Sequence, residues 1–92
     1  MIIRWTKPSA ADLTHICDYM EKRFGAAQAR RAAMAVYDVA DSLKDMPLLG
    51  RSGRKPGTRE LTVSGFPFLI IYRVGKDAIE VLRVLHGSQQ WP

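Results

Sequence analysis

The sequence contains a single cysteine, so no internal disulfide supports the fold. Cys17 follows His15 at a spacing that is not typical of a metal-ligand set, and we expect it to be a small buried apolar side chain. Two other kinds of chemical motif are missing: a glycine-rich phosphate loop and a cluster of His and Cys residues. The sequence therefore predicts no metal site and no other cofactor.

Long apolar runs are also missing, which excludes a transmembrane helix of ordinary length. The first residues, MIIRWTKPSAAD, lack the pattern of a signal peptide. With 92 residues, of which 47% are hydrophobic, the chain suits one small domain spanning residues 1–92. We expect a cytoplasmic protein that does not act at a membrane.

Acidic residues become scarce in the second half of the chain. The formal net charge is +5, of which residues 1–46 contribute +1 and residues 47–92 contribute +4. Four cations fall within nine residues that contain no acid: Arg51, Arg54, Lys55 and Arg59. Such a cluster favours an acidic partner, either nucleic acid or an acidic protein segment, although a solubilising loop remains an alternative.

Two helices are expected after a short first strand at Ile2–Trp5. Ser9, with Asp12 three residues later as an acidic capping partner, predicts the start of the first helix, and Gly25 its end. The alanine-rich segment 26–45 predicts a second helix that ends before Pro47. The tight glycine turn predicts an antiparallel helical hairpin. The apolar stripes comprise Leu13, Ile16, Cys17, Met20 and Phe24 in the first helix, and Ala29, Ala32 or Ala33, Val36, Tyr37, Ala40 and Leu43 in the second.

The second half of the chain predicts strands. Residues 50–57 carry the signals of a loop, residues 58–64 those of a strand, and residues 66–86 those of a hairpin with a turn at Lys76-Asp77. The element order is β-α-α-β-β-β. We therefore expect an α+β fold in which a helical hairpin packs on a small, mostly antiparallel four-stranded sheet.

A two-residue turn at Lys76-Asp77 would fix the register of the hairpin. Arg73 then lies opposite Glu80, Ile71 opposite Leu82, and Leu69 opposite Val84. The face predicted to meet the helices carries Phe68, Ile70, Tyr72, Ile79, Val81, Arg83 and Leu85. The more open face would carry Arg73, Glu80 and His86.

Few residues suggest catalysis. His86 is the strongest candidate for proton transfer, because a histidine titrates near neutral pH, but a structural role at the end of a strand is an alternative. Arg73 is expected to pair with Glu80, and Arg83 to bind helix C-terminal carbonyls or an acidic partner. Trp91 is expected to be a packing anchor.

Three motifs together resemble a known superfamily. Gly57-Thr58-Arg59-Glu60-Leu61, Tyr72-Arg73-Val74 and Arg83-Val84-Leu85-His86-Gly87, in this element order, are similar to RelE/ParE toxins of bacterial type II toxin–antitoxin systems. The resemblance covers nearly the whole chain. It implies a growth-inhibiting toxin with a role such as plasmid stabilisation, which a cognate antitoxin neutralises in a hetero-oligomeric complex.

The resemblance implies two different activities. RelE-like members cleave mRNA on the ribosome, and they typically carry an arginine three residues before the tyrosine that matches Tyr72, where this chain has Leu69. They also use a C-terminal tyrosine or histidine; this chain has no tyrosine in its last few residues and offers His86 and Trp91. ParE-like members poison DNA gyrase by protein–protein contact that involves the C-terminal region, and the RVLHG ending resembles theirs.

We therefore interpret the chain as a ParE-like inhibitor of gyrase, with a RelE-like endoribonuclease as the alternative and a non-catalytic nucleic-acid-binding module as the third. If it is a nuclease, the catalytic candidates are His86 and Arg59. The predicted target- or RNA-binding residues are Arg51, Arg54, Lys55, Arg59, Arg73, Arg83 and Trp91. An apolar groove between helices and sheet, rimmed by the basic loop, is expected to bind the antitoxin.

Overall fold

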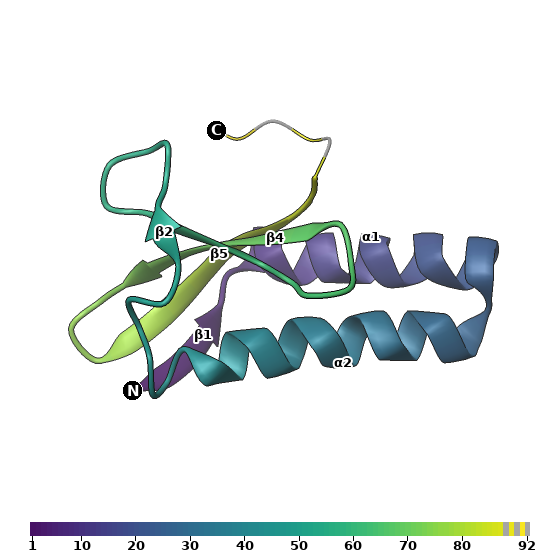
Figure 1. Ribbon diagram of the computed structural model, residues 1–92, viewed down its shortest axis with the longest axis horizontal. Coiled ribbons are helices and arrows are strands. Elements are labelled where there is room, and N and C mark those ends of the chain that lie inside the picture. Colours follow the sequence, from purple (N-terminus) through teal and green to yellow (C-terminus); the bar gives the residue numbers. More distant parts are fainter. Residues whose placement is uncertain (88, 90, 92) are drawn as a thin grey trace.

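The computed structural model, which describes residues 1–87, 89 and 91, places two helices against one face of a five-stranded sheet (Figure 1). The elements are β1 (Ile2–Trp5), α1 (Lys7–Phe24), α2 (Ala26–Ser42), β2 (Arg51–Ser52), β3 (Arg59–Thr62), β4 (Phe68–Val74) and β5 (Ala78–His86). The strand order is β1-β5-β4-β3-β2, in which β1 runs parallel to β5 and every other pair is antiparallel. The predicted α+β fold is confirmed, and the short β2 is an additional strand within the segment predicted as a loop.

The first helix begins earlier than the sequence pattern predicts. Its N-cap is Thr6, whose hydroxyl oxygen accepts a hydrogen bond from the backbone N–H of Ser9 at 3.3 Å, and Pro8 lies in the first turn. A proline fits there because the first-turn N–H groups have no partner within the helix. The predicted capping box of Ser9 and Asp12 is therefore wrong, and Asp12 is available for another contact.

The helical hairpin packs through small side chains. Ala29, Ala32 and Ala40 of α2 are buried in the main core, which allows the two antiparallel helices to approach closely. Gly25 joins them at φ +90°, a conformation that favours glycine. Two members of the predicted apolar stripes are not in the core: Phe24 is 61% exposed and Tyr37 is 49% exposed. α2 ends at Ser42, three residues before the predicted end.

The β4–β5 hairpin follows the predicted register only near its turn. Gly75 donates its N–H to the carbonyl of Ala78 at 2.8 Å, and Arg73 lies opposite Glu80, as predicted. A β-bulge between Ile71 and Tyr72 then shifts the pairing, so that Ile71 lies opposite Arg83. The prediction that Ile71 faces Leu82 is wrong, because the bulge adds one residue to β5. Leu69 likewise lies opposite Leu85 and not Val84.

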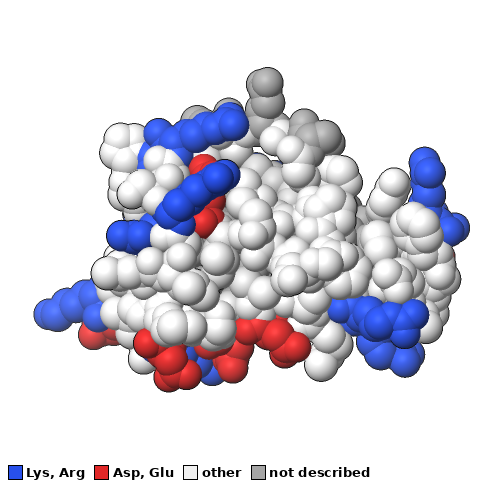
Figure 2. Space-filling view, in the orientation of Figure 1, with Lys and Arg blue, Asp and Glu red and all other residues white. Residues whose placement is uncertain are grey.

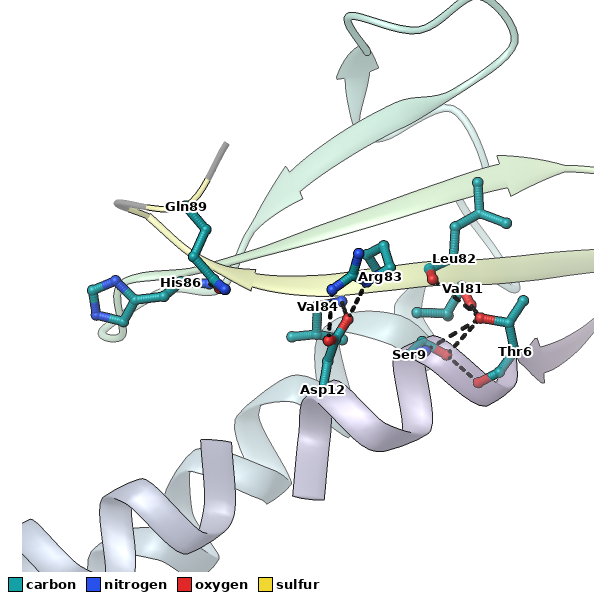
Figure 3. A network of polar contacts seen from close by, with 9 residues as sticks. All are labelled: Thr6, Ser9, Asp12, Val81, Leu82, Arg83, Val84, His86 and Gln89. Atoms are coloured by element: carbon teal, nitrogen blue, oxygen red, sulfur yellow. Dashed lines mark hydrogen bonds and ion pairs between the residues drawn. The ribbon is translucent and has the colours of Figure 1, made fainter. Parts of the chain in front are cut away.

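The start of α1 explains the bulge. β1 ends beside Val81, so the edge of β5 beyond this point meets α1 and not a strand. The Thr6 hydroxyl lies 3.1 Å from the carbonyl oxygens of both Val81 and Leu82 (Figure 3). The Asp12 carboxylate accepts the backbone N–H of Val84 at 3.0 Å. These contacts satisfy backbone groups that a neighbouring strand would otherwise bind.

The opposite face of the sheet is covered without helices. Figure 1 shows the β2–β3 loop on the side of the sheet away from α1 and α2, and Trp91 contacts Lys55 of this loop. Ile71 is fully buried on this side, and Glu60, its partner across β3 and β4, is only 6% exposed. Within residues 1–87, 89 and 91, no helix is both long and apolar enough to cross a membrane.

Candidate functional site

An apolar groove runs between α1 and the turn that joins β3 to β4. It consists of two adjoining hollows of about 380 and 340 Å³, which share Tyr19, Phe68 and His86. Figure 1 shows the helical hairpin extending past this turn, so the far half of the hairpin overhangs the sheet. We call the surface formed by Tyr19, Phe24, Phe66, Phe68 and His86 the aromatic groove.

Ring contacts shape the floor of the aromatic groove. Phe66 stacks on Phe68 with ring centroids 5.6 Å apart, and His86 meets Phe68 edge-on at 6.3 Å. On the rim, Tyr19 is 47% exposed and carries the guanidinium of Arg23 at 5.2 Å from its ring centroid. An exposed aromatic surface with a cationic rim suits an amphipathic segment that carries acidic groups.

The bulge decides where His86 lies. It pairs with Phe68 and lines the aromatic groove, so the prediction that it shares the open face with Arg73 and Glu80 is wrong. Its backbone N–H donates to Oε1 of Gln89 at 2.7 Å, and the Gln89 N–H donates to the His86 carbonyl at 2.9 Å. His15 of α1 lines the same hollow.

Arg83 acts as a clamp between sheet and helix. Its Nε and Nη2 donate to the two carboxylate oxygens of Asp12 at 2.6 and 2.9 Å (Figure 3). These hydrogen bonds raise the pKa of the Arg83 guanidinium, although burial opposes the shift. Figure 3 shows the His86 imidazole directed away from this pair. Arg83 thus binds an acidic side chain of α1, and neither the predicted helix carbonyls nor an acidic partner.

A second surface lies on the other side of the sheet. Arg51 pairs with the carboxylate of Glu60 at 3.2 Å, and the backbone N–H of Arg54 donates to the same carboxylate at 3.2 Å. The Lys55 ammonium lies 5.8 Å from the ring centroid of Trp91, which is half-buried. We call the surface formed by Arg51, Arg54, Lys55 and Trp91 the basic loop face. Figure 2 shows Lys and Arg gathered at this end of the molecule, with acidic atoms between them.

The C-terminal segment contributes Trp91 to this surface. Its residues Gly87, Gln89 and Trp91 are described, whereas Ser88, Gln90 and Pro92 lie outside the described residues. The contact between Trp91 and Lys55 links the end of the chain to the β2–β3 loop. The prediction that the basic loop rims the apolar groove is wrong, because no residue of this loop lines either hollow.

Arg59 supports the backbone and is not part of the basic loop face. Its Nη1 donates to the Gly50 carbonyl at 2.7 Å, and it pairs with Tyr72 across β3 and β4. Because His86 lies opposite Phe68, four residues from Tyr72 along β4, the two catalytic candidates are separated by about 13 Å along the strand. The fold does not bring His86 and Arg59 together.

Arg73 remains at the hairpin turn, with its predicted partner. Its guanidinium binds the Glu80 carboxylate, and this hydrogen bond, together with the charge of Arg73, lowers the pKa of Glu80. The pair is remote from His86, at the opposite end of β4 and β5. Within the part of the chain that the structure describes, no group of three or more His, Cys, Asp or Glu side chains could hold a metal ion.

Known proteins match the chain over almost its full length. The family model described as "ParE toxin of type II toxin-antitoxin system, parDE" matches residues 3–91. The chain belongs to the ParE toxin family. It is 41% identical over 90 residues to the "Putative toxin Y4kP" of Sinorhizobium fredii, covering 98% of this chain and 92% of that protein. It is also 35% identical over 85 residues to "Toxin RelE2" of Caulobacter vibrioides, covering 92% and 93%.

A solved structure confirms the arrangement of this ParE-family chain. The structure described as "Chromosomal ParDE TA system from P. aeruginosa" superposes with a TM-score of 0.87 at 31% sequence identity. The match covers 94% of this chain and 95% of the other. Family membership thus agrees with the resemblance in the sequence motifs.

Proposed function

We propose that this ParE-family toxin inhibits growth by binding DNA gyrase through a protein–protein interface, and that a cognate antitoxin neutralises it. The observation that carries the proposal is the separation of His86 from Arg59. Cleavage of RNA needs a base, an acid and cations around one phosphate. Here Arg59 is bound to backbone carbonyls and Arg83 to Asp12, so neither supplies that charge beside His86.

The basic loop face suits contact with a target. Tryptophan and arginine are the residues that most often carry binding energy at protein interfaces. This face combines the half-buried Trp91 with two exposed cations, Arg54 and Lys55. Glu60 holds the loop in place from below through Arg51 and the Arg54 backbone. Such a held loop loses little conformational entropy when a partner binds.

The aromatic groove suits the antitoxin. Its exposed rings, Tyr19 and Phe24, do not contribute to the main core, yet they form a continuous surface with Phe66 and Phe68. The similarity to a protein of a ParDE toxin–antitoxin system supports an antitoxin as the occupant. Co-expressed antitoxin should raise the melting temperature of the toxin by mass action.

The RelE-like endoribonuclease is the second candidate, and one observation favours it. His15 and His86 line the same hollow, so two side chains of a type that can transfer protons lie on one surface without Arg59. The RelE name of the Caulobacter relative agrees with this alternative. In this form the reaction would depend on both histidines.

Induction of the chain in growing cells separates the two candidates. The proposal predicts a DNA-damage response, intact bulk mRNA and continued translation in the first minutes. His86→Gln should inhibit growth as strongly as the parent chain, and so should His15→Gln. Cleavage of mRNA that disappears in His86→Gln would establish the nuclease instead, and arrest of translation without DNA damage would refute gyrase as the target.

A further inference from the structure

The solvent face of α2 carries a stripe that no role above explains. Arg30, Met34, Tyr37 and Asp41 follow one another at spacings of four, three and four residues, which places them along one line of the helix. All four are exposed: Met34 is 56% exposed, Tyr37 49%, and the Asp41 side chain 67%. The core stripe of Ala29, Ala32, Val36 and Ala40 lies on the other side of the helix.

The charges of this stripe run against the helix dipole. A helix N-terminus favours acids and a C-terminus favours bases. α2 has no acid in its first turn and no base in its last turn. Instead, Arg30 lies just after the first turn and Asp41 lies in the last. Figure 2 shows Lys and Arg gathered where α2 begins, and Asp and Glu where it ends. Stability of the monomer therefore does not account for the arrangement.

The stripe is complementary to itself. If a second α2 lies antiparallel across it, a two-fold axis between Met34 and Tyr37 places Arg30 opposite Asp41, and Met34 opposite Tyr37. The four–three–four spacing is the spacing of a heptad seam, in which antiparallel helices form layers of this kind. Each copy also places the positive end of its dipole beside the negative end of the other.

We propose that α2 of one chain binds α2 of a second copy in an isologous antiparallel dimer. Two Arg30–Asp41 pairs flank an apolar centre of Met34 and Tyr37. The ring of Tyr37 is held by Trp5, with centroids 5.4 Å apart and the planes at 63°, so its position at the centre is fixed before association. Lys44 contacts Asp41 at 2.6 Å within the same chain, and Arg30 of the other copy replaces or shares that contact.

The size of the surface predicts a weak complex. α2 has 17 residues and is therefore about 25 Å long. One pair of such helices buries less than the roughly 1,200 Å² that is typical of stable interfaces. We expect dissociation constants on the order of 10⁻⁴ M, and weaker binding as salt screens the ion pairs.

Sedimentation of the purified full-length chain over a range of concentrations tests the dimer. The parent chain should approach the dimer mass at low salt. Arg30→Glu should weaken association about tenfold, because each interface then holds two acid–acid contacts. Asp41→Arg should weaken it similarly, and the double variant Arg30→Glu/Asp41→Arg should restore it. Both single changes agree with the helix dipole, so loss of association cannot be attributed to unfolding.

Arg31→Glu is the matched control, since it makes the same change in charge on another line of the helix, where Arg31 binds Gln28 at 2.9 Å. It should leave association within about threefold of the parent chain. A monomer at every concentration, a double variant that fails to restore association, or a control as damaging as Arg30→Glu would overturn the dimer. Arg30→Glu that leaves the mass unchanged but weakens antitoxin binding would also overturn it, and would assign the stripe to the antitoxin.

Discussion

The aromatic groove and the basic loop face lie on opposite sides of the sheet and are built in different ways. The groove is formed by a rigid helix and a turn, and its rim rings, Tyr19 and Phe24, are exposed. The basic loop face is formed by a loop that hydrogen bonds hold onto the sheet, with Glu60 at its centre. One surface is apolar and the other is cationic, so they suit partners of different chemistry.

This difference shows how one small domain can present two surfaces of different chemistry. The main core requires neither the exposed groove rings nor the loop cations. A change on either surface should therefore alter one interaction and leave both the fold and the other interaction intact. The physical basis for this expectation is that substitutions at distant, independent sites usually have additive effects on free energy.

The largest expected effect comes from Trp91. Trp91→Ala should abolish growth inhibition and weaken gyrase binding at least about 30-fold, which corresponds to a typical interface hot spot. Antitoxin binding should not change. Removal of residues 88–92 should also abolish growth inhibition, but it removes Gln89, which lines the aromatic groove, so Trp91→Ala is the selective change. If the shortened chain unfolds, Trp91 is an anchor of the core, and its proposed role at the target is wrong.

A substitution in the groove should have the opposite selectivity. Phe24→Asp should weaken antitoxin binding about tenfold while growth inhibition by the free toxin persists, because the ring is 61% exposed and does not belong to the main core. Leu48→Asp is the matched control, since Leu48 is 64% exposed and lies away from the groove. Titration of each variant with purified antitoxin measures the two affinities. Equal loss of affinity in the two variants would remove the groove as the antitoxin site.

A smaller effect is expected from the anchor of the basic loop. The buried Tyr72 hydroxyl donates to the Pro47 carbonyl at 2.8 Å and accepts the Gly50 N–H at 2.8 Å. Tyr72→Phe should lower the free energy of unfolding by about 1–3 kcal/mol, because two backbone groups lose their partner. Urea denaturation measures the change, with the half-exposed Tyr37→Phe as control. An unchanged unfolding free energy would show that the hydroxyl does not hold this segment.

The smallest effect concerns Arg73 and Glu80. The pKa of Glu80 is lowered in the folded chain, so the folded state favours the ionised carboxylate. The pair therefore contributes stability above the pKa of the unfolded chain, and this contribution is lost as the pH falls through the folded pKa. Glu80→Gln should lower Tm slightly at pH 7 and not at acidic pH. A difference in Tm that persists in acid would rule out ionisation of Glu80 as the cause.

The sequence predicted those features that depend on neighbouring residues. The helical hairpin follows from its apolar spacing and Gly25, and the turn at Lys76-Asp77 follows from two apolar strands around a short polar segment. The pairing of Arg73 with Glu80 is only three residues from that turn on each strand, and it is confirmed. Local patterns therefore predicted the element order and the α+β architecture.

The positions of the site residues depend on contacts that are distant in sequence. The bulge in β5 forms where Thr6, the N-cap of α1, and Asp12 of α1 form hydrogen bonds with backbone groups at the edge of β5. These residues are more than 70 positions away in the chain. One extra residue in β5 moves His86 from the open face to the aromatic groove. Periodicity alone cannot reveal such an insertion, because every residue beyond it changes face. The same limit applies to Glu60, whose burial depends on the loop that folds over it.

A DNA-cleavage assay with purified gyrase tests whether the toxin acts on gyrase through the basic loop face. The parent chain and His86→Gln should both cause gyrase to accumulate double-strand breaks, whereas Trp91→Ala should not, and the added antitoxin should suppress the breaks caused by the first two. Loss of activity in His86→Gln together with full activity in Trp91→Ala, or no effect of the parent chain on gyrase, would show that the toxin does not act on gyrase through the basic loop face.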